Sequence, residues 1–239
     1  MKLSNVVYGV ALASAVLLSG TARAQAPLCG NPFEASTGPW DYRTATPAQR
    51  AVVENRHFTP EVRMMRKGAG TSRNLAADIA YTLRVFPNHH QALMTMSEWA
   101  LKIRQDPPPD AVYTVACWFE RALRFAPDDA LVKVVYGTAL IKRGRTQDAI
   151  GYLEGALAVA GDDANVYYNL GLAYFDLKDY TKSLANAHAA YRLGFPLPGL
   201  KNKLERAGAW QPIPVSAPAA ASAAPGGETV PPAETEAAQ

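Results

Sequence analysis

Four histidines and two cysteines are the residues in this sequence best suited to bind a metal or to act as catalytic groups. His57, His89 and His90 define one hypothesis, an enzyme or a metal-binding protein of the cell envelope. Adjacent histidines such as His89 and His90 point in different directions from a helix start. No cysteine or carboxylate stands at a matching ligand spacing. We therefore expect no metal site and no cofactor.

Cys29 and Cys117 are separated by 88 positions, and two interpretations of them stay open. In the first, they form a disulfide that ties the N-terminal segment to a helix. Closing so long a loop would stabilise the fold by about 4 kcal/mol through the entropy of the unfolded chain. In the second, Cys117 is a buried small hydrophobe and Cys29 is unpaired.

The common catalytic motifs are missing from the sequence. It contains no glycine-rich phosphate loop, no His-Glu-x-x-His and no Gly-x-Ser-x-Gly. A nucleophile needs a base and a group that orients the base. Cys117, between Ala116 and Trp118, has no such signature around it. We predict that the protein is not an enzyme.

Residues 1–24 have the features of a cleavable signal peptide. Lys2 supplies the positive charge, residues 6–18 the apolar segment, and Ala22 and Ala24 the cleavage site before Gln25. An uncleaved anchor is the alternative. The signal predicts a periplasmic or secreted protein, which meets an oxidising compartment. The sequence has no uninterrupted apolar run long enough for a permanent membrane span. The net charge of +3 is too slight to indicate nucleic-acid binding.

Residues 25–71 are predicted to form an N-terminal arm followed by short helices. The arm, residues 25–46, contains three aromatic side chains that need a surface to pack on. Thr46-Pro47 and Thr59-Pro60 each combine a helix N-cap with a proline suited to the first helical position. These pairs predict helices at about 47–56 and 60–67.

From Ser72 onward, helical periodicity predicts an all-α array, with helices at 72–86, 88–104 and 111–125. The sequence then repeats at an offset of 34 residues, which places Asp129 on Asp163 and Gly137 on Gly171. Each unit contains two amphipathic helices that cannot bury their apolar faces alone, so they need neighbours of the same kind. The glycines indicate points where two helices approach closely.

The best-preserved unit, 165–191, carries Tyr167, Leu170, Gly171 and Tyr174 at spacings that resemble the tetratricopeptide repeat. The resemblance covers residues 72–195 and extends to a group of exported proteobacterial repeat proteins without established activity. It implies a right-handed solenoid of about three helical hairpins. Residues 196–210 would then form a capping helix. Residues 211–239, rich in Pro, Ala, Ser, Gly and Glu, are predicted to be disordered.

The resemblance also implies a concave groove lined by the first helix of each hairpin. Carried over by register, its lining is Gln91, Met94, Glu98, Leu101, Leu131, Val134, Thr138, Ile141, Asn165, Tyr168, Leu172 and Phe175. This set is mostly apolar and lacks the combination of Lys, Arg and Asn side chains with which some family members clamp a terminal carboxylate. It therefore favours an apolar or aromatic segment over an acidic one.

Three functional hypotheses follow. The leading one is a periplasmic scaffold that binds a protein or peptide partner of the cell envelope in the groove. The histidine-based enzyme or metal-binding protein is the second, and a structural subunit of an envelope assembly is the third. Within the first hypothesis, the groove is either open or filled by the chain's own N-terminal arm or by the helices at 47–67, because exposed apolar surfaces of this size are uncommon.

Overall fold

The computed structural model describes residues 29–68 and 74–212. The predicted signal peptide at 1–24 and nearly all of the predicted disordered tail lie outside these residues. Within the described part, the chain forms ten helices and no strand, so the all-α prediction is confirmed there. The helices are α1 (Pro47–Glu54), α2 (Pro60–Arg63), α3 (Leu75–Val85), α4 (His90–Ile103), α5 (Val115–Phe125), α6 (Ala130–Lys142), α7 (Thr146–Ala160), α8 (Ala164–Asp176), α9 (Tyr180–Arg192) and α10 (Gly199–Arg206).

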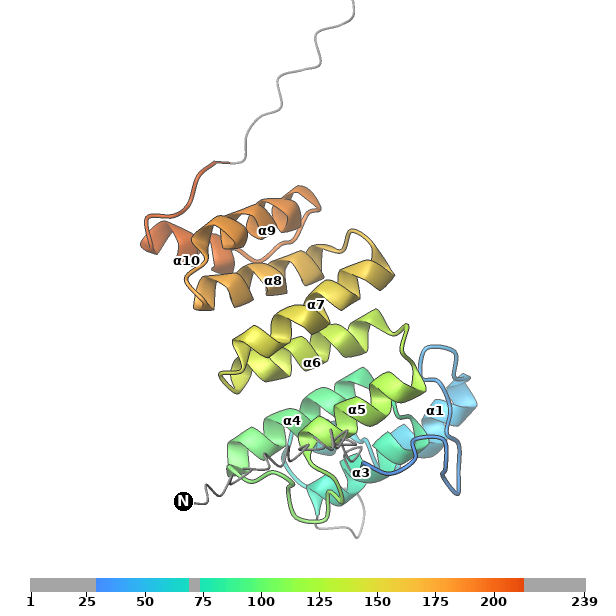
Figure 1. The fold of residues 1–239 in the computed structure, drawn as a ribbon. Helices are drawn as coiled ribbons and strands as arrows, with labels where there is room; N and C mark the ends of the chain where they lie inside the picture. Colours follow the sequence, from blue (N-terminus) through green and yellow to red (C-terminus); the bar gives the residue numbers. More distant parts are fainter. Residues whose placement is uncertain (1–28, 69–73, 213–239) are drawn as a thin grey trace, which may run out of the picture.

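Helical hairpins stack on one another in a repeat-like arrangement (Figure 1). Helix α6 packs along α7, and α8 packs along α9, while α4, α6 and α8 follow one another through the stack. Helix α10 closes the C-terminal end against α8 and α9. At the other end, the short helices α1 and α2 pack on α3. None of the helices in the described residues is long and apolar enough to cross a membrane.

Equivalent aspartates start two of the stacked helices. Asp129 accepts hydrogen bonds from the backbone N–H groups of Leu131 and Val132, and Asp163 accepts one from Val166. A side chain at this position satisfies N–H groups that have no partner inside the helix. The two caps are 34 positions apart, so the repeated sequence produces a repeated helix start.

Helix α5 begins later than predicted. We expected a helix over 111–125, but it starts at Val115, and Thr114 is its N-cap. The side chain of Thr114 accepts a hydrogen bond from the Cys117 N–H, and Asp106 accepts one from the Val115 N–H. These polar contacts hold the preceding residues in the loop, where an apolar periodicity alone would extend the helix.

The main core lies between α3, α4, α5 and α6. Leu83, Met96 and Phe119 are fully buried in it, together with Trp118. The Phe119 ring stacks on Tyr136 with a centroid distance of 4.4 Å, which joins α5 to α6. This core makes the first two hairpins a rigid base for the side chains described next.

Candidate binding groove

One cavity of about 250 Å³ spans helices α4, α6 and α8. Six of the predicted groove residues line it: Met94, Glu98, Leu131, Val134, Thr138 and Asn165. Its lining also includes five residues outside the predicted set: Ser97, Val135, Ala139, Lys142 and Asn169. We call this cavity the groove. Its lining is mainly apolar, with polar groups at its edges.

Four of the five additional residues lie one position further along the helix than a predicted residue, while Ser97 lies one position before Glu98. Leu131 and Asn165 are 34 positions apart, and so are Val135 and Asn169. In contrast, Val134 is buried at the floor, because its helix face turns toward the next hairpin. Positions 131, 135, 138 and 142 therefore describe the open face of α6 better than the predicted positions 131, 134, 138 and 141.

The polar groups of the groove are joined by short contacts. Lys142 Nζ lies 2.6 Å from Glu98 Oε1, which connects α6 to α4. Thr138 Oγ1 donates to the Val134 carbonyl at 2.9 Å and lies 3.4 Å from Asn169 Oδ1. Hydroxyl and amide groups at the edge of an apolar floor can bond to the backbone of a bound peptide. The arrangement supports binding by packing and orientation, and it contains no pair of groups arranged for nucleophilic attack.

Six of the twelve predicted groove residues lie outside the lining of this cavity. Tyr168, Leu172 and Phe175 pack against the α10 cluster of Leu200 and Leu204. The Tyr168 ring also stacks on Phe195 at 4.1 Å. Helix α10 occupies the place that a further hairpin would take, so it covers the face of α8 that the register assigned to the groove. Ile141 packs against the core between hairpins and is not part of the cavity lining. Gln91 is also outside the lining, and Leu101 lines a neighbouring cavity.

The N-terminal arm packs outside the groove. Trp40 and Tyr42 contact the cluster of Val53, Val85 and Phe86, and the Phe33 ring lies 5.6 Å from Phe125. No residue of the described arm lines the groove. The arm over residues 29–46 therefore does not fill the groove, and no residue of 47–67 lines it either.

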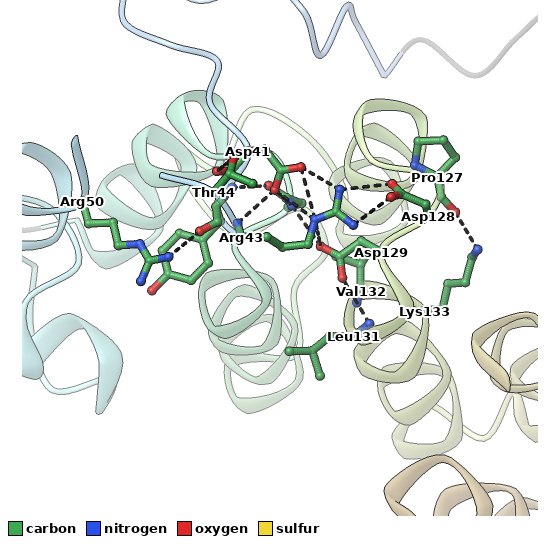
Figure 2. A network of polar contacts seen from close by, with 12 residues as sticks. Asp41, Arg43, Thr44, Arg50, Pro127, Asp128, Asp129, Leu131, Val132 and Lys133 are labelled. Carbon is green, nitrogen blue, oxygen red and sulfur yellow. Dashed lines mark hydrogen bonds and ion pairs between the residues drawn. The ribbon is translucent and has the colours of Figure 1, made fainter. Parts of the chain in front are cut away.

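A charged network fastens the arm to the start of α6. Arg43 contacts Asp41 at 2.7 Å and Asp128 at 3.0 Å, and its Nε lies 3.7 Å from Asp129 (Figure 2). Asn88 donates to both Asp41 and Asp129. The Arg43 guanidinium holds the pKa of Asp41 down at about 2. The network connects the arm to the same aspartate that caps α6.

The structure contains the disulfide between Cys29 and Cys117, with a Cα–Cα distance of 5.0 Å. The backbone carbonyl of Cys29 accepts a hydrogen bond from Nη1 of the buried Arg121 at 2.9 Å. The arm is thus attached to α5 by a covalent bond and a hydrogen bond. Of the two interpretations left open by the sequence, the structure contains the disulfide and not the unpaired cysteines.

The histidines do not converge on one site. His57 Nδ1 lies 3.0 Å from Asp78 Oδ1 beside α3, while His188 contacts the Gln211 carbonyl near the C-terminal end. His89 is completely buried, and the neighbouring His90 ring is partly buried. Among the described residues, no three His, Cys, Asp or Glu side chains are grouped so that they could hold a metal ion.

His89 has a structural role at the start of α4. Its Nδ1 accepts the Ala92 N–H at 3.2 Å, so the neutral ring carries its proton on Nε2. Nε2 lies 3.4 Å from Glu54 Oε1, which is long for a hydrogen bond. The Tyr42 ring stacks on the imidazole at 3.9 Å. Burial lowers the pKa of His89 below its ordinary value, and this outweighs the attraction of Glu54.

We expect acid to destabilise the protein through His89. Because the pKa of His89 is lowered in the folded state, the unfolded chain takes up the proton first as the pH falls. The stability contributed by the neutral ring is complete above pH 6.5, the ordinary pKa, and is lost below it. Between pH 7.5 and 5 the loss is at most about 2 kcal/mol, the limit that this ordinary pKa sets. Urea unfolding at the two pH values measures it.

The matched variant for this experiment is His89→Asn, which keeps an N-cap acceptor and removes the titration. It should be less stable at pH 7.5 and should show a weaker pH dependence. Glu54, whose pKa lies at about 2 because of its contact with His89, titrates below this range. His90, whose pKa burial also lowers, contributes with the same sign, and His90→Asn measures its share. An unchanged pH dependence in His89→Asn would contradict the assignment.

Comparison of the sequence with models of protein families and with curated proteins gave no match in either case.

Proposed function

We propose that this protein is an exported, non-enzymatic module of the tetratricopeptide-repeat type that binds a segment of another cell-envelope protein. The groove would be its binding site. Three lines of reasoning support the proposal: the 34-residue repeat, the signal-like N-terminus, and the stacked helical hairpins. The proposed family and compartment are supported by the sequence alone, and the proposed binding site is supported by the cavity.

The observation that carries the proposal is an apolar cavity, unfilled by the arm, across three successive hairpins. Met94 and Leu131 are 40% and 42% exposed and line the same cavity, so they belong to one shared apolar surface. Such surfaces usually mark a site of interaction. At about 250 Å³ the cavity suits a few side chains of a peptide, and it is smaller than most sites that enclose a small molecule.

The chemistry of the groove favours a partner segment that presents two or three apolar side chains. Val135 and Ala139 contribute apolar surface to its lining. Asn165 and Asn169 lie at one end and can bond to the peptide backbone. Packing would supply most of the affinity, because the Glu98–Lys142 pair already satisfies the charges beside it.

Leu131→Glu is expected to weaken partner binding at least tenfold. The substitution places a charge on the apolar wall of the groove, where the partner would bury it without a counter-charge. The matched control is Val159→Glu, because Val159 is 44% exposed on α7 and is not part of the groove lining. Both variants should fold, since both side chains already contact water.

The measurement is quantitative affinity capture from envelope extract, followed by titration of the captured protein against each variant. Equal capture by Leu131→Glu and the unmodified protein would contradict the groove as the binding site. The compartment is tested separately. The mass of the protein recovered from the periplasm should correspond to a chain that begins at Gln25, and a chain that keeps residues 1–24 would contradict the proposed export.

A further inference from the structure

A second cavity, of about 310 Å³, adjoins the groove where α4 and α6 end. Its lining consists of Ala100, Leu101, Arg104, Gln105, Asp106 and Arg143. Arg143 Nη1 donates to Ser97 Oγ at 2.5 Å, and Ser97 lines the groove. The two cavities therefore meet at this contact, and a peptide that lies along α4 would pass from the apolar groove to the second cavity.

The second cavity has an excess of positive charge. The guanidinium of Arg143 bonds only to neutral acceptors, the Ser97 hydroxyl and the carbonyls of Ser97 and Ala139. Within residues 29–68 and 74–212, neither Arg104 nor Arg143 takes part in an ion pair. Asp106, the carboxylate of this lining, accepts the Val115 N–H and also attracts the Arg143 guanidinium, so the lining holds two positive charges and one negative charge. The predicted lining contained no basic residue and therefore favoured an apolar ligand. The structure adds two arginines beside it.

The chain itself contains a segment with the complementary pattern. Residues 213–239 include no lysine or arginine and three glutamates, at 228, 234 and 236. Between these glutamates lies the apolar stretch Val230-Pro231-Pro232-Ala233. An apolar stretch followed by two carboxylates matches an apolar groove followed by two arginines. The prolines also reduce the entropy that the segment loses when it binds in an extended form.

The length of chain beyond the described residues is sufficient to reach the groove. The described part ends at Pro212, beside α9, where His188 contacts the Gln211 carbonyl. From α10 to α4 the stack contains three helix spacings of 8–10 Å, or about 30 Å. Eighteen positions separate Pro212 from Val230, and such a chain spans up to about 60 Å when extended. A flexible chain of that length has an average end-to-end distance of about 23 Å.

We propose that residues 228–236 bind in the groove of their own chain, with Val230 and Pro231 on the apolar floor and Glu234 and Glu236 beside Arg104 and Arg143. This inference rests on the proposed function of the groove and adds its first occupant. Tethering provides an effective concentration in the millimolar range, so the few contacts of a short segment are enough. The tail then competes with an external partner, which has to displace it.

Photo-crosslinking in the complete mature chain tests the proposal. A benzophenone amino acid replaces Val230 in one sample and Ala219 in another, and mass spectrometry locates the crosslinks after irradiation. The probe at Val230 should react mainly with residues 94–101 and 131–142, within single chains. The probe at Ala219 lies in the connecting segment and should give at least fivefold less of these products.

A charge variant provides the second readout. Glu234→Gln combined with Glu236→Gln should reduce the crosslinks from Val230 about threefold or more, because exposed ion pairs contribute modestly. Raising the salt concentration should reduce them in the unmodified chain and have less effect in the variant. The same variant should bind an external partner more tightly. The dissociation constant should fall by about the factor by which occupancy of the groove by the tail had raised it.

Several outcomes would overturn the proposal. The first is that all crosslinks join two different chains. The second is that crosslinks from Val230 are absent or spread over the surface without preference for the groove. The third is that the glutamine substitutions leave the crosslink yield unchanged. These results are separable from a failure of the proposed function. If partner capture still depends on Leu131 while the tail gives no groove crosslinks, the tail proposal alone fails. If the tail crosslinks to the groove but no captured protein depends on Leu131 for binding, the tail is the occupant of the groove. That result would contradict the proposed external partner.

Discussion

Replacing Cys29 with serine is expected to lower the free energy of unfolding by about 4 kcal/mol. The disulfide with Cys117 closes a loop of 88 positions, and opening it returns the lost conformational freedom to the unfolded chain. The folded chain keeps other contacts of the arm, including the Arg121 hydrogen bond to the Cys29 carbonyl. Urea unfolding under oxidising conditions, at a constant pH of 7.5, measures the difference.

The controls for this prediction use the other cysteine. Cys117→Ser and the double variant should be as unstable as Cys29→Ser, because each change removes the same bond. Addition of a thiol reductant should destabilise the unmodified protein and leave all three variants unaffected. A loss of less than 1 kcal/mol, or three variants with clearly different stabilities, would show that the covalent link does not restrict the unfolded chain as expected.

Gly137→Ala is expected to destabilise the protein by about 2 kcal/mol, although alanine favours a helix more than glycine does. A Cβ atom at this position would lie 2.7 Å from Leu153 Cγ. Leu153 is completely buried, so it cannot move into water to make room. Forcing extra volume into a packed core typically costs 1–3 kcal/mol. The change should separate α6 from α7 and lower the stability measured by denaturant.

Gly151→Ala is the matched control on the partner helix α7. A Cβ atom there meets nothing within 4 Å, so only the helix preference remains. This substitution should raise stability by about 0.5–1 kcal/mol. The two glycine variants are thus expected to differ in sign. If Gly137→Ala were as stabilising as Gly151→Ala, the close approach of the two helices would not constrain the fold.

The repeat in the sequence contains much of the information for the local structure. Asp129 and Asp163 cap equivalent helices, as their 34-residue spacing predicts. Gly137 lies where α6 and α7 approach closely, which the repeated glycine indicated. These features depend on contacts within one hairpin. A short range of sequence therefore specifies them, and they can be predicted without knowledge of the neighbours.

The groove was predicted only in part, because exposure depends on what packs against each face. Leu131 and Met94 line it as predicted, but Tyr168 and Phe175 are covered by α10. An apolar helix position looks the same in sequence whether it faces a groove or a neighbouring helix. The last hairpin differs from the others because its neighbour is a capping helix. Assigning the same environment to equivalent positions of every repeat misses that difference.

The sequence by itself determined the helical class, the 34-residue repeat and the starts of α1 and α2, because a helix start of this kind depends on a capping residue and a proline that are adjacent in the chain. The start of α5 was predicted four residues too early. Only the tertiary structure decided that Cys29 meets Cys117, that the arm packs outside the groove, and that Arg143 lies beside Ser97. Cys29 and Cys117 are 88 positions apart, and Ser97 and Arg143 are 46 positions apart. The formation of these contacts depends on the packing of the whole stack, which no local pattern of residues specifies.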